Sequence, residues 1–536
     1  MTDLPNWSLH PADMVVLGLY FLFIIGIAIW VARKVDTGED LFLAGRSLTW
    51  GVIGFSLFAS NISSTTLIGL AGQAYTTGIA VSNYEWMAGV VLVFMSAFII
   101  PVFLKAKITT VPEYLELRFN RTCRLYFSAL TIILSILIDT AGALYAASLT
   151  LQVFFPSLVI WQACAAMAIF AGLYTAFGGL KAVVLTDVMQ ALVLLFGACA
   201  MTYLVYARFD FSWEAATAGI PERQLDLLPP LDDPALPWLG TLVGVPILGF
   251  WYWATNQYIT QRVLAAKNIR HAQQGAVFAG LLKMLPLFIM VLPGVWAVNL
   301  YPELENGDQV FPVLIKDVLP VGLTGLVLAG LFAAIMSSID STLNSASTLI
   351  VKDFAENEIL ERRMSPEKRA FWGKVTTLIL MVIATIWAPM IANFQGLFAY
   401  LQQAYAVVVP PVVIVFVMGI FWRGATVKAA LSTLFIGHAI GVGFFLAKNS
   451  QSLGLTSENL WDLHFTITIG IVTVISAIIF LLTSLITEKS SEEVTKGTLW
   501  RKELAIPEEK ISWWQDYRLY GGIMLALTAV MLVFWG

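Results

Sequence analysis

The sequence predicts an all-α polytopic membrane protein with 14 transmembrane helices, and three observations support this fold class. First, 58% of the 536 residues are hydrophobic and only 12% are charged, which is about half the charged fraction of soluble domains. Second, the apolar runs are about 20 residues long, the length of a helix that crosses a bilayer, and they do not alternate as barrel strands do. Third, the basic residues between these runs are distributed very unevenly.

The apolar runs follow one another from near the start of the chain to its end. The first run lacks a basic n-region and a small-residue cleavage site, and Arg33 and Lys34 follow it. We therefore interpret it as a retained helix and not as a signal peptide. The predicted spans are residues 13–32, 51–74, 80–104, 125–153, 158–177, 183–207, 238–261, 273–299, 320–351, 372–391, 396–421, 426–446, 465–487 and 517–535.

An even number of spans places both termini on the same side of the membrane, and the basic residues predict which side. If both termini are extracellular or periplasmic, 26 of the 31 Lys and Arg residues lie on inner loops or at the inner ends of spans, 4 lie on outer loops and Lys283 lies well inside a span. Basic loops are strongly enriched on the cytoplasmic side of membrane proteins. The split therefore supports both the number of spans and their orientation.

Two of the predicted spans are interrupted by polar residues or proline. The second contains FSLFASNISSTTLIG (55–69), and the eleventh contains AYLQQAYAVVVPPVV (399–413). Paired interrupted spans in the two halves of a chain are typical of transporters built from inverted repeats, whose binding site lies near the bilayer midplane.

Few charged residues lie inside the spans. Each could form a structural ion pair or lie near the membrane interface, but intramembrane charges more often face a cavity when several occur in one bundle. The sequence therefore predicts a hydrophilic cavity. The charged residues within the spans are Glu85, Asp139, Asp187, Lys283 and Asp340.

The ninth span carries a polar face within IMSSIDSTLNSAST (335–348). Single hydroxyls in a helix commonly bond back to the carbonyl four residues earlier, but that does not explain a whole face with a carboxylate in it. Hard cations prefer several oxygen ligands, and a broken second span could add backbone carbonyls to them. The pattern favours an oxygen-lined sodium site. The residues that share this face at helical spacing are Ser337, Asp340, Ser341, Asn344, Ser345 and Thr348.

Ordered motifs along the chain carry a resemblance to a known family. They are LFLAGRSLTW (41–50), FASNIS (58–63), YEWM (84–87), FGGLKAVVLTDVMQ (177–190), WYWATNQYITQRVLAAK (251–267), FAAIMSS (332–338), LNSASTL (343–349) and MGIFW (418–422). This set resembles the sodium/solute symporter family, and is most similar to its sugar branch, the bacterial sodium/galactose symporter and the mammalian sodium/glucose cotransporters. The resemblance runs from about residue 13 to the final span.

The resemblance implies 14 helices, of which ten form a leucine-transporter-like 5+5 inverted-repeat core. The first repeat would be residues 51–207 and the second 238–421, joined by the outer loop 208–237. Residues 1–50 would supply an extra helix and an inner loop, and residues 422–536 three further helices.

The resemblance also implies a sodium site between the first and eighth core helices. Its ligands would be backbone oxygens of Ala59, Ile62 and Ala334 and the hydroxyls of Ser337 and Ser338. Asp187, in TDVMQ, would stabilise the ion from behind without necessarily touching it.

Asp340 is left unexplained by this sodium site. In relatives that bind a second sodium ion, nearby serines help to build that site, and the corresponding positions here are Asp340 and Ser341. Asp340 could instead hold a proton.

For the substrate, the resemblance implies the polar pair Glu85 and Lys283, together with Gln402 and Asn61. Tyr252 would cover the sugar ring as an inner gate, with Trp253 beside it. Sugar hydroxyls need donors and acceptors, and the C–H faces of a sugar ring favour an aromatic platform.

Three positions depart from the galactose symporter, because Thr66, Ala88 and Gly249 stand where it has a glutamine, a serine and an asparagine. The expected solute is therefore a hexose such as galactose or glucose, a polyol such as inositol, or a modified sugar. No firm family role is implied for Asp139, which could be an acceptor at the edge of the pocket or a partner for a basic residue on the inner side.

The expected function is sodium-coupled import of a sugar or polyol by alternating access. Two alternatives stay open: proton coupling through Asp340 and Asp187, and a membrane sensor or channel with the same fold. The sequence holds no enzyme motif of the P-loop or nucleophile-elbow type and no basic block for nucleic acid. We expect sodium as the only metal, no organic cofactor, and a multi-pass cell-membrane location, specifically a bacterial inner membrane. Protein partners are not predicted.

Overall fold

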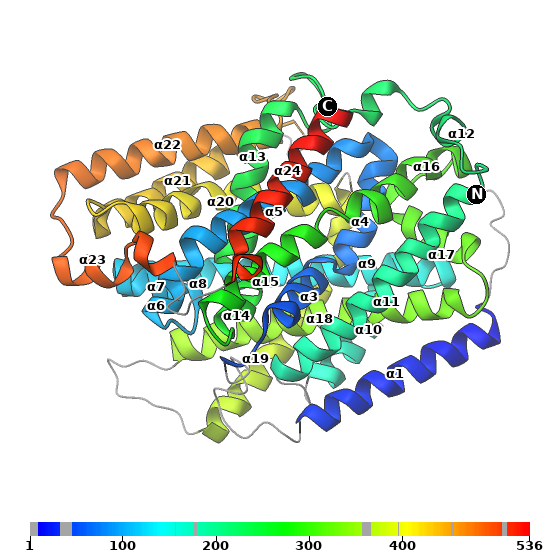
Figure 1. Cartoon of the computed structure of the whole chain (residues 1–536), viewed down its shortest axis with the longest axis horizontal. Helices are drawn as coiled ribbons and strands as arrows, with labels where there is room; N and C mark the ends of the chain where they lie inside the picture. Colours follow the sequence, from blue (N-terminus) through cyan, green and yellow to red (C-terminus); the bar gives the residue numbers. More distant parts are fainter. Residues whose placement is uncertain are drawn as a thin grey trace.

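Helices form at each predicted span in the computed structural model (Figure 1), which describes residues 9–32, 46–155, 157–175, 180–355, 366–394, 396–451, 455–505 and 512–536. Within these residues there is no β-strand, only an isolated bridge between Leu48 and Ala266. The all-helical class is the expected one, because a helix satisfies its backbone hydrogen bonds within one segment in lipid.

The first half of the chain consists of helices that are often broken or contain a short π-helical turn. In order, they are α1 (Pro11–Ala32), α3 (Trp50–Asn61), α4 (Ser64–Thr77), η2 (Ile79–Ser82), α5 (Asn83–Phe94), η3 (Met95–Ile99), α6 (Ile100–Ala106), α7 (Val111–Arg118), α8 (Arg121–Leu134), η4 (Ser135–Thr140), α9 (Ala141–Phe154), α10 (Ile160–Thr175) and α11 (Leu180–Ala207).

The second half begins after a polar connection that contains α12 (Trp213–Thr217) and η5 (Glu222–Leu225). Its helices are α13 (Trp238–Phe250), η6 (Trp251–Thr255), α14 (Gln257–Leu264), α15 (Ile269–Leu282), η7 (Leu287–Val291), α16 (Leu292–Leu300), η8 (Gly307–Gln309), α17 (Val310–Val318), α18 (Leu323–Leu349), η9 (Ile350–Ala355), α19 (Pro366–Trp387), η11 (Ala388–Asn393), α20 (Leu397–Phe421), α21 (Val427–Lys448), α22 (Phe465–Ile486), α23 (Glu492–Thr498), η12 (Lys502–Ala505), η13 (Trp513–Gln515) and α24 (Tyr517–Trp535).

By length and composition, ten helices among the described residues could cross a membrane, or eleven if the bent pair α3 and α4 is one span. The predicted spans 13–32 and 158–177 contribute shorter apolar stretches, Pro11–Phe23 and Ile160–Ile169. The predicted span 238–261 is divided between α13 with η6 and the separate α14. The structure thus supports a polytopic helical membrane protein, whereas the number 14 stays a prediction.

The interruption predicted in the second span is confirmed, and the one predicted in the eleventh is wrong. Helices α3 and α4 meet at an angle of 56°, with Ile62 between them at φ −74° and ψ 65°. Helix α20 instead runs without a break through Pro410 and Pro411. In the second half the chain breaks elsewhere, between η6 and α14 at Asn256 and after α15 at Lys283.

The two ends of the chain contact the beginning of the predicted span 320–351 and the predicted outer loop 208–237. The Asp13 carboxylate accepts hydrogen bonds from the backbone N–H groups of Gly322 and Gly325, at 2.6 and 2.8 Å. At the other end, the Leu227 N–H donates to the Trp535 carbonyl at 2.8 Å. These contacts agree with termini on one side of the bundle, while the assignment of that side to the outside stays a prediction.

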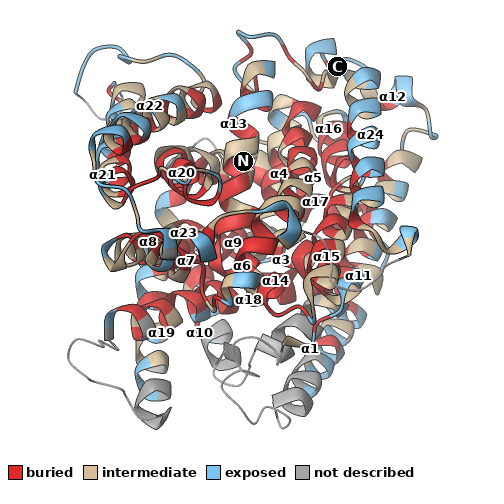
Figure 2. Ribbon diagram, turned by 60° about the vertical axis from the view of Figure 1, so that its left-hand side comes forward, coloured by how far each residue is buried: buried red, intermediate tan, exposed pale blue. Residues whose placement is uncertain are grey.

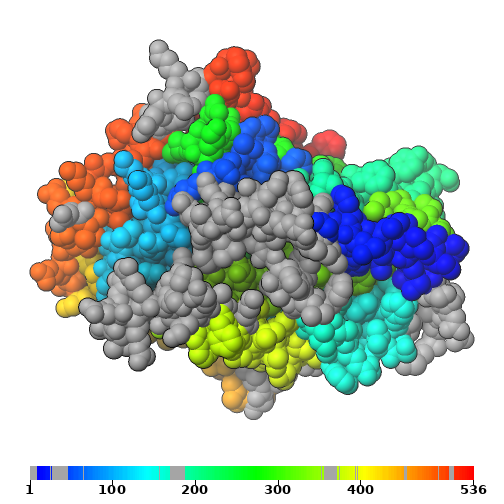
Figure 3. Space-filling view, turned by 90° about the horizontal axis from the view of Figure 1, so that it is seen from below, coloured from blue at the N-terminus to red at the C-terminus, as the bar shows by residue number. Residues whose placement is uncertain are grey.

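Helix α18 lies at the centre of the bundle, and the helices near the two ends of the chain lie at its edges (Figures 1 and 2). In its most apolar window α18 is 83% buried, against 33% for α22 and 17% for α24. From below, α1 forms one edge of the molecule and the α22–α23 region the opposite edge (Figure 3). Four residues of the polar face of α18, Ser337, Asp340, Ser341 and Ser345, are therefore buried in protein, whereas Asn344 is exposed and Thr348 is half-buried.

Candidate functional site

The break between α3 and α4 exposes backbone and hydroxyl groups to the interior of the bundle. Helix α3 ends at Asn61, and the carbonyls of a last helical turn have no partner within the helix. One of them is used locally, because the Thr66 hydroxyl donates to the Asn61 carbonyl at 2.5 Å. Ser63 precedes the first residue of α4 in an extended conformation, so the chain turns sharply here.

Helix α18 supplies hydroxyl groups opposite this break. The Ser338 hydroxyl donates to the Ala334 carbonyl at 2.9 Å, and the Thr342 hydroxyl donates to the Ser338 carbonyl, also at 2.9 Å. These are hydrogen bonds to the carbonyl four residues earlier, which is the simpler explanation for hydroxyl groups in a helix. They do not exclude a cation, because a hydroxyl that donates its proton backwards keeps its oxygen lone pairs for another ligand.

One internal cavity of about 100 Å³ joins these two segments, which is space for several water molecules, since one water needs about 10–15 Å³ by this measure. Its lining includes Ser60, Asn61 and Thr66 from the α3–α4 region and Ser338 from α18. The cavity thus brings Ser338 together with the α3–α4 break, whereas Ala59, Ile62, Ala334 and Ser337 are not in its described lining, and the sodium site stays a prediction.

The predicted substrate residues line this same cavity. They come from five different helical segments, and the two other positions that depart from the galactose symporter, Ala88 and Gly249, are also in the wall. The predicted substrate residues in the lining are Asn61, Thr66, Glu85, Tyr252, Trp253 and Gln402.

Lys283 completes this wall from just behind it. Its ammonium group forms an ion pair with Glu85 and donates to the Asn61 side-chain oxygen. The side chain is fully buried, and its Nζ lies 5.7 Å from the centre of the Trp253 ring. A buried pair of this kind is costly to desolvate unless each partner is well bonded, so Glu85, Asn61 and Trp253 together hold the lysine.

Local backbone chemistry explains why Lys283 points inward. Helix α15 stops at Leu282, Lys283 caps it, and Pro286 follows before η7. Proline cannot donate a backbone hydrogen bond and clashes with the preceding turn of a helix. The resulting kink lies where Lys283 reaches the cavity wall.

Aromatic rings form a further side of the cavity. Tyr252 and Trp253 lie on the π-helical turn η6, with ring centres 5.1 Å apart and nearly perpendicular. The Tyr258 hydroxyl, at the start of α14, donates to the Tyr252 hydroxyl at 2.9 Å. A pair of tyrosines linked in this way offers both an apolar ring face and a polar edge.

The remaining residues predicted for the sodium sites do not line the main cavity in the described part of the structure. Ala59 and Ile62 line a small neighbouring cavity with α11 and η7, and Ser337 is buried. Asp187 is in α11, but its side chain lies outside the described residues. Asp340 and Ser341 are 4% and 7% exposed, and neither belongs to the described lining of the main cavity.

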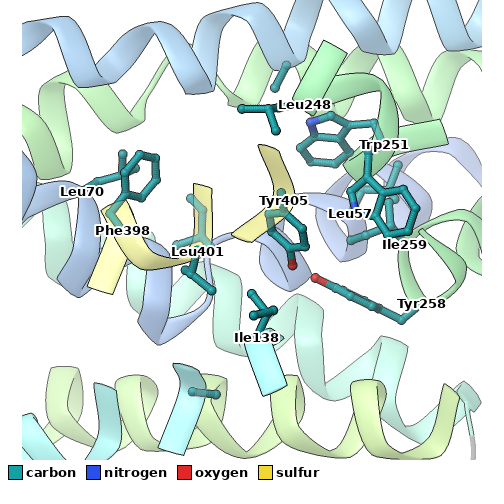
Figure 4. Packing of buried hydrophobic residues seen from close by; sticks show 14 of the residues in the cluster. Leu57, Leu70, Ile138, Leu248, Trp251, Tyr258, Ile259, Phe398, Leu401 and Tyr405 are labelled. Atoms are coloured by element: carbon teal, nitrogen blue, oxygen red, sulfur yellow. The ribbon is translucent and has the colours of Figure 1, made fainter. Parts of the chain in front are cut away.

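Two further residues line the cavity, Asp139, whose role the sequence left open, and Tyr405, which the sequence did not single out. The Tyr405 hydroxyl donates to the Asp139 carboxylate. Figure 4 shows the hydroxyl groups of Tyr405 and Tyr258 directed toward each other, with Ile138 close by. The intramembrane charge of Asp139 was the available signal, but only the fold relates it to α20.

Comparisons with known proteins identify the family of this chain. The model of the "Sodium:solute symporter family" matches residues 41–437. The sodium/myo-inositol cotransporter 2 of Oryctolagus cuniculus is 34% identical over 92% of this chain and 80% of its own. The sodium/glucose cotransporter of Vibrio parahaemolyticus is 32% identical over 98% of both chains.

The fold also has a solved counterpart. The substrate-bound outward-open structure of a Na⁺-coupled sialic acid symporter superposes with a TM-score of 0.75, at 21% identity, over 90% of this chain and 99% of that one. The family match covers most of the chain, and the relatives are cotransporters and not enzymes. The chain belongs to the sodium:solute symporter family.

Proposed function

We propose that this protein is a sodium-coupled symporter that imports a sugar or polyol by alternating access. The observation that carries the proposal is the single cavity between the broken α3–α4 segment, Ser338 of α18 and the Glu85–Lys283 pair. Such a cavity lets one helix break serve an ion on one side and an organic solute on the other.

For the ion, the proposed ligands are the carbonyls of Ala59, Ile62 and Ala334 and the hydroxyls of Ser337 and Ser338. All of these atoms are hard oxygens, which suit a hard cation. Asp187 is proposed to add negative charge behind the site, and Asp340 with Ser341 to contribute to a second cation site.

For the solute, Lys283 is proposed as a donor, and Glu85, Asn61 and Gln402 as acceptors or donors for hydroxyl groups. Tyr252 and Trp253 would cover an apolar ring face, with Tyr252 as the inner gate. The named relatives transport glucose or myo-inositol, so the proposed substrate class is a hexose or a cyclic polyol.

Coupling follows if sodium holds α3 against α18 and thereby shapes the solute side of the cavity. Sodium must then tighten solute binding by the same factor as the solute tightens sodium binding. We further propose 14 spans in a 5+5 inverted repeat, with both termini outside a bacterial inner membrane.

The test is uptake of radiolabelled myo-inositol, galactose and glucose by proteoliposomes that contain the purified full chain. We expect uptake with an inward sodium gradient and none when choline replaces sodium. A third arm imposes a pH gradient without sodium. Uptake driven by that arm would establish proton coupling in place of sodium coupling, and equal flux in choline would contradict any coupling to sodium.

A further inference from the structure

Asp139 is an intramembrane carboxylate that the proposed function does not use. It lies on the π-helical turn η4 and lines the cavity. Glu85 is the other carboxylate in the described lining, but Glu85 is paired with Lys283. Among the described side chains none forms an ion pair with Asp139, and its hydrogen bond comes from the neutral Tyr405 hydroxyl.

The fold holds Asp139 at a defined position. The hydroxyl groups of Thr140 and of Thr342 on α18 are hydrogen-bonded at 2.8 Å. The Tyr400 hydroxyl of α20 donates to the Leu137 carbonyl at 2.8 Å. With Tyr405 on Asp139 itself, these bonds fix η4 to α18 and α20 on both sides of the carboxylate. π-helical turns commonly occur at functional sites.

A carboxylate in such a position needs hydrogen-bond donors. Burying a charged group costs free energy unless hydrogen bonds replace the lost water, and an ionised carboxylate has about four acceptor positions on its two oxygens. Tyr405 supplies one donor to one of these oxygens. A pair of adjacent hydroxyl groups on a ring could supply two more, and hydrogen bonds to a charged acceptor are the stronger kind.

Glu85 and Asp139 line the cavity from different helical segments. Glu85 is on α5, which packs against α13 and α15, whereas η4 packs against α18 and α9. A solute that bonds to both carboxylates must therefore carry hydroxyl groups at more than one position of its ring. A cyclic polyol has this property, because its hydroxyl groups continue around the ring.

We propose that Asp139 is a specificity-determining residue that accepts hydrogen bonds from adjacent hydroxyl groups of the substrate, at ring positions other than those that bond to the Glu85–Lys283 pair, and that Tyr405 is its positioning residue. The inference rests on the proposed function and narrows the substrate class to a polyhydroxylated ring such as a cyclitol.

The experiment measures sodium-driven uptake of myo-inositol and of its monodeoxy analogues by wild type, Asp139→Ala and Glu85→Gln. In the wild type, removal of a substrate hydroxyl that donates to Asp139 should raise KM by about tenfold or more, as expected for a hydrogen bond to a charged group. In Asp139→Ala that penalty should fall to less than about threefold, because the acceptor is already gone. The penalties for other hydroxyl positions, and the half-saturating sodium concentration, should stay within about twofold.

Tyr405→Phe and Tyr400→Phe form a matched pair, because both hydroxyls bond to η4 but only Tyr405 lines the cavity. Tyr405→Phe should weaken discrimination at the same hydroxyl position, and Tyr400→Phe should not. Tyr405→Phe also keeps the test open if Asp139→Ala fails to assemble, since it retains the carboxylate. Stabilisation of each variant by sodium in a thermal-shift assay shows that it is folded.

If removal of a substrate hydroxyl raises KM by the same factor in Asp139→Ala and Tyr405→Phe as in the wild type, the inference is overturned and the proposed function is left intact. A wild-type preference for an amino sugar that disappears in Asp139→Ala would also overturn it, because Asp139 would then bind the ammonium group of the substrate. No sodium-driven uptake of any sugar or polyol by the wild type would withdraw the proposed function and this inference together.

Discussion

The helices around the cavity have an irregular backbone, whereas the helices at the end of the chain are continuous. Around the cavity, α3 and α4 are broken, η4 and η6 are π-helical, and α15 is kinked at Lys283. At the periphery, α21, α22 and α24 each run without interruption for 19 to 22 residues. Irregular backbone is tolerated at membrane depth only where protein or a cavity satisfies it.

The comparison shows where this molecule can bury polar side chains. The buried ion pair, the hydroxyl face of α18 and the linked tyrosines all adjoin broken or π-helical segments. The peripheral helix α22 packs instead through close backbone approach, with its Thr466 against Gly244 on α13. The central region should therefore respond to changes of charge, and the periphery to changes of volume.

The largest effect is expected from Lys283→Met, which leaves Glu85 buried without its partner. Removing one member of a buried pair typically costs about 3–5 kcal/mol, and we expect uptake to fall more than about a hundredfold. Thermal unfolding in detergent and proteoliposome uptake measure the two effects. The double variant Glu85→Gln/Lys283→Met should regain stability but not uptake.

The matched control for this pair is Arg423→Met, because Arg423 pairs with Glu492 and both side chains are exposed, at 69% and 80%. An exposed pair contributes at most about 1 kcal/mol, so stability and uptake should hardly change. Equal losses in the Lys283 and Arg423 variants would remove the distinction between the two regions.

The second effect tests volume at the periphery with Gly244→Ala. A methyl group there would lie 2.8 Å from the Thr466 carbonyl carbon and closer still to its oxygen. Overpacking of this kind costs about 1–3 kcal/mol, which thermal unfolding should detect, while the half-saturating sodium concentration stays the same. Gly443→Ala on α21 has no atom within 4 Å of the new methyl group and should be neutral or stabilising by about 0.5–1 kcal/mol.

A third effect, smaller in stability but specific to the ion, is expected from Ser338→Ala. Loss of one proposed ligand should raise the half-saturating sodium concentration by about tenfold, measured by uptake at saturating solute. Thr348→Ala removes a hydroxyl of the same predicted face that bonds back to Asn344 at 2.7 Å, outside the described lining of the cavity. A similar rise in both variants would show that the sodium effect is not local.

The smallest effect concerns the start of α24. Hydrogen bonding to Arg518 lowers the pKa of the Asp516 carboxyl, which also caps this helix. A lowered pKa gives a contribution that is present above the unfolded value and is lost as pH falls through the folded one. Asp516→Asn keeps a capping oxygen, so its stability should differ from wild type by about 0.5 kcal/mol or less near pH 6, and the difference should shrink as pH falls below the ordinary pKa of an aspartate. Thermal unfolding across this pH range checks it, and a gap that widens at low pH would contradict it.

Much of the fold could be predicted because bilayer thickness and backbone desolvation act locally on about 20 residues at a time. The sequence by itself determined the helical membrane class, the break near Ile62, the polar face of α18 and the small set of intramembrane charges. The family motifs then indicated that Glu85, Lys283, Tyr252 and Gln402 belong together.

Only the tertiary structure decided which distant residues meet. Asn61 and Lys283 are 222 positions apart and bond directly, and Asp139 acquires a partner in Tyr405 only when η4 lies beside α20. The intact α20 shows the same limit, because Pro410 and Pro411 resemble a break in the sequence. Hydropathy and helical spacing describe one segment, whereas ion pairing and cavity lining depend on how several segments pack.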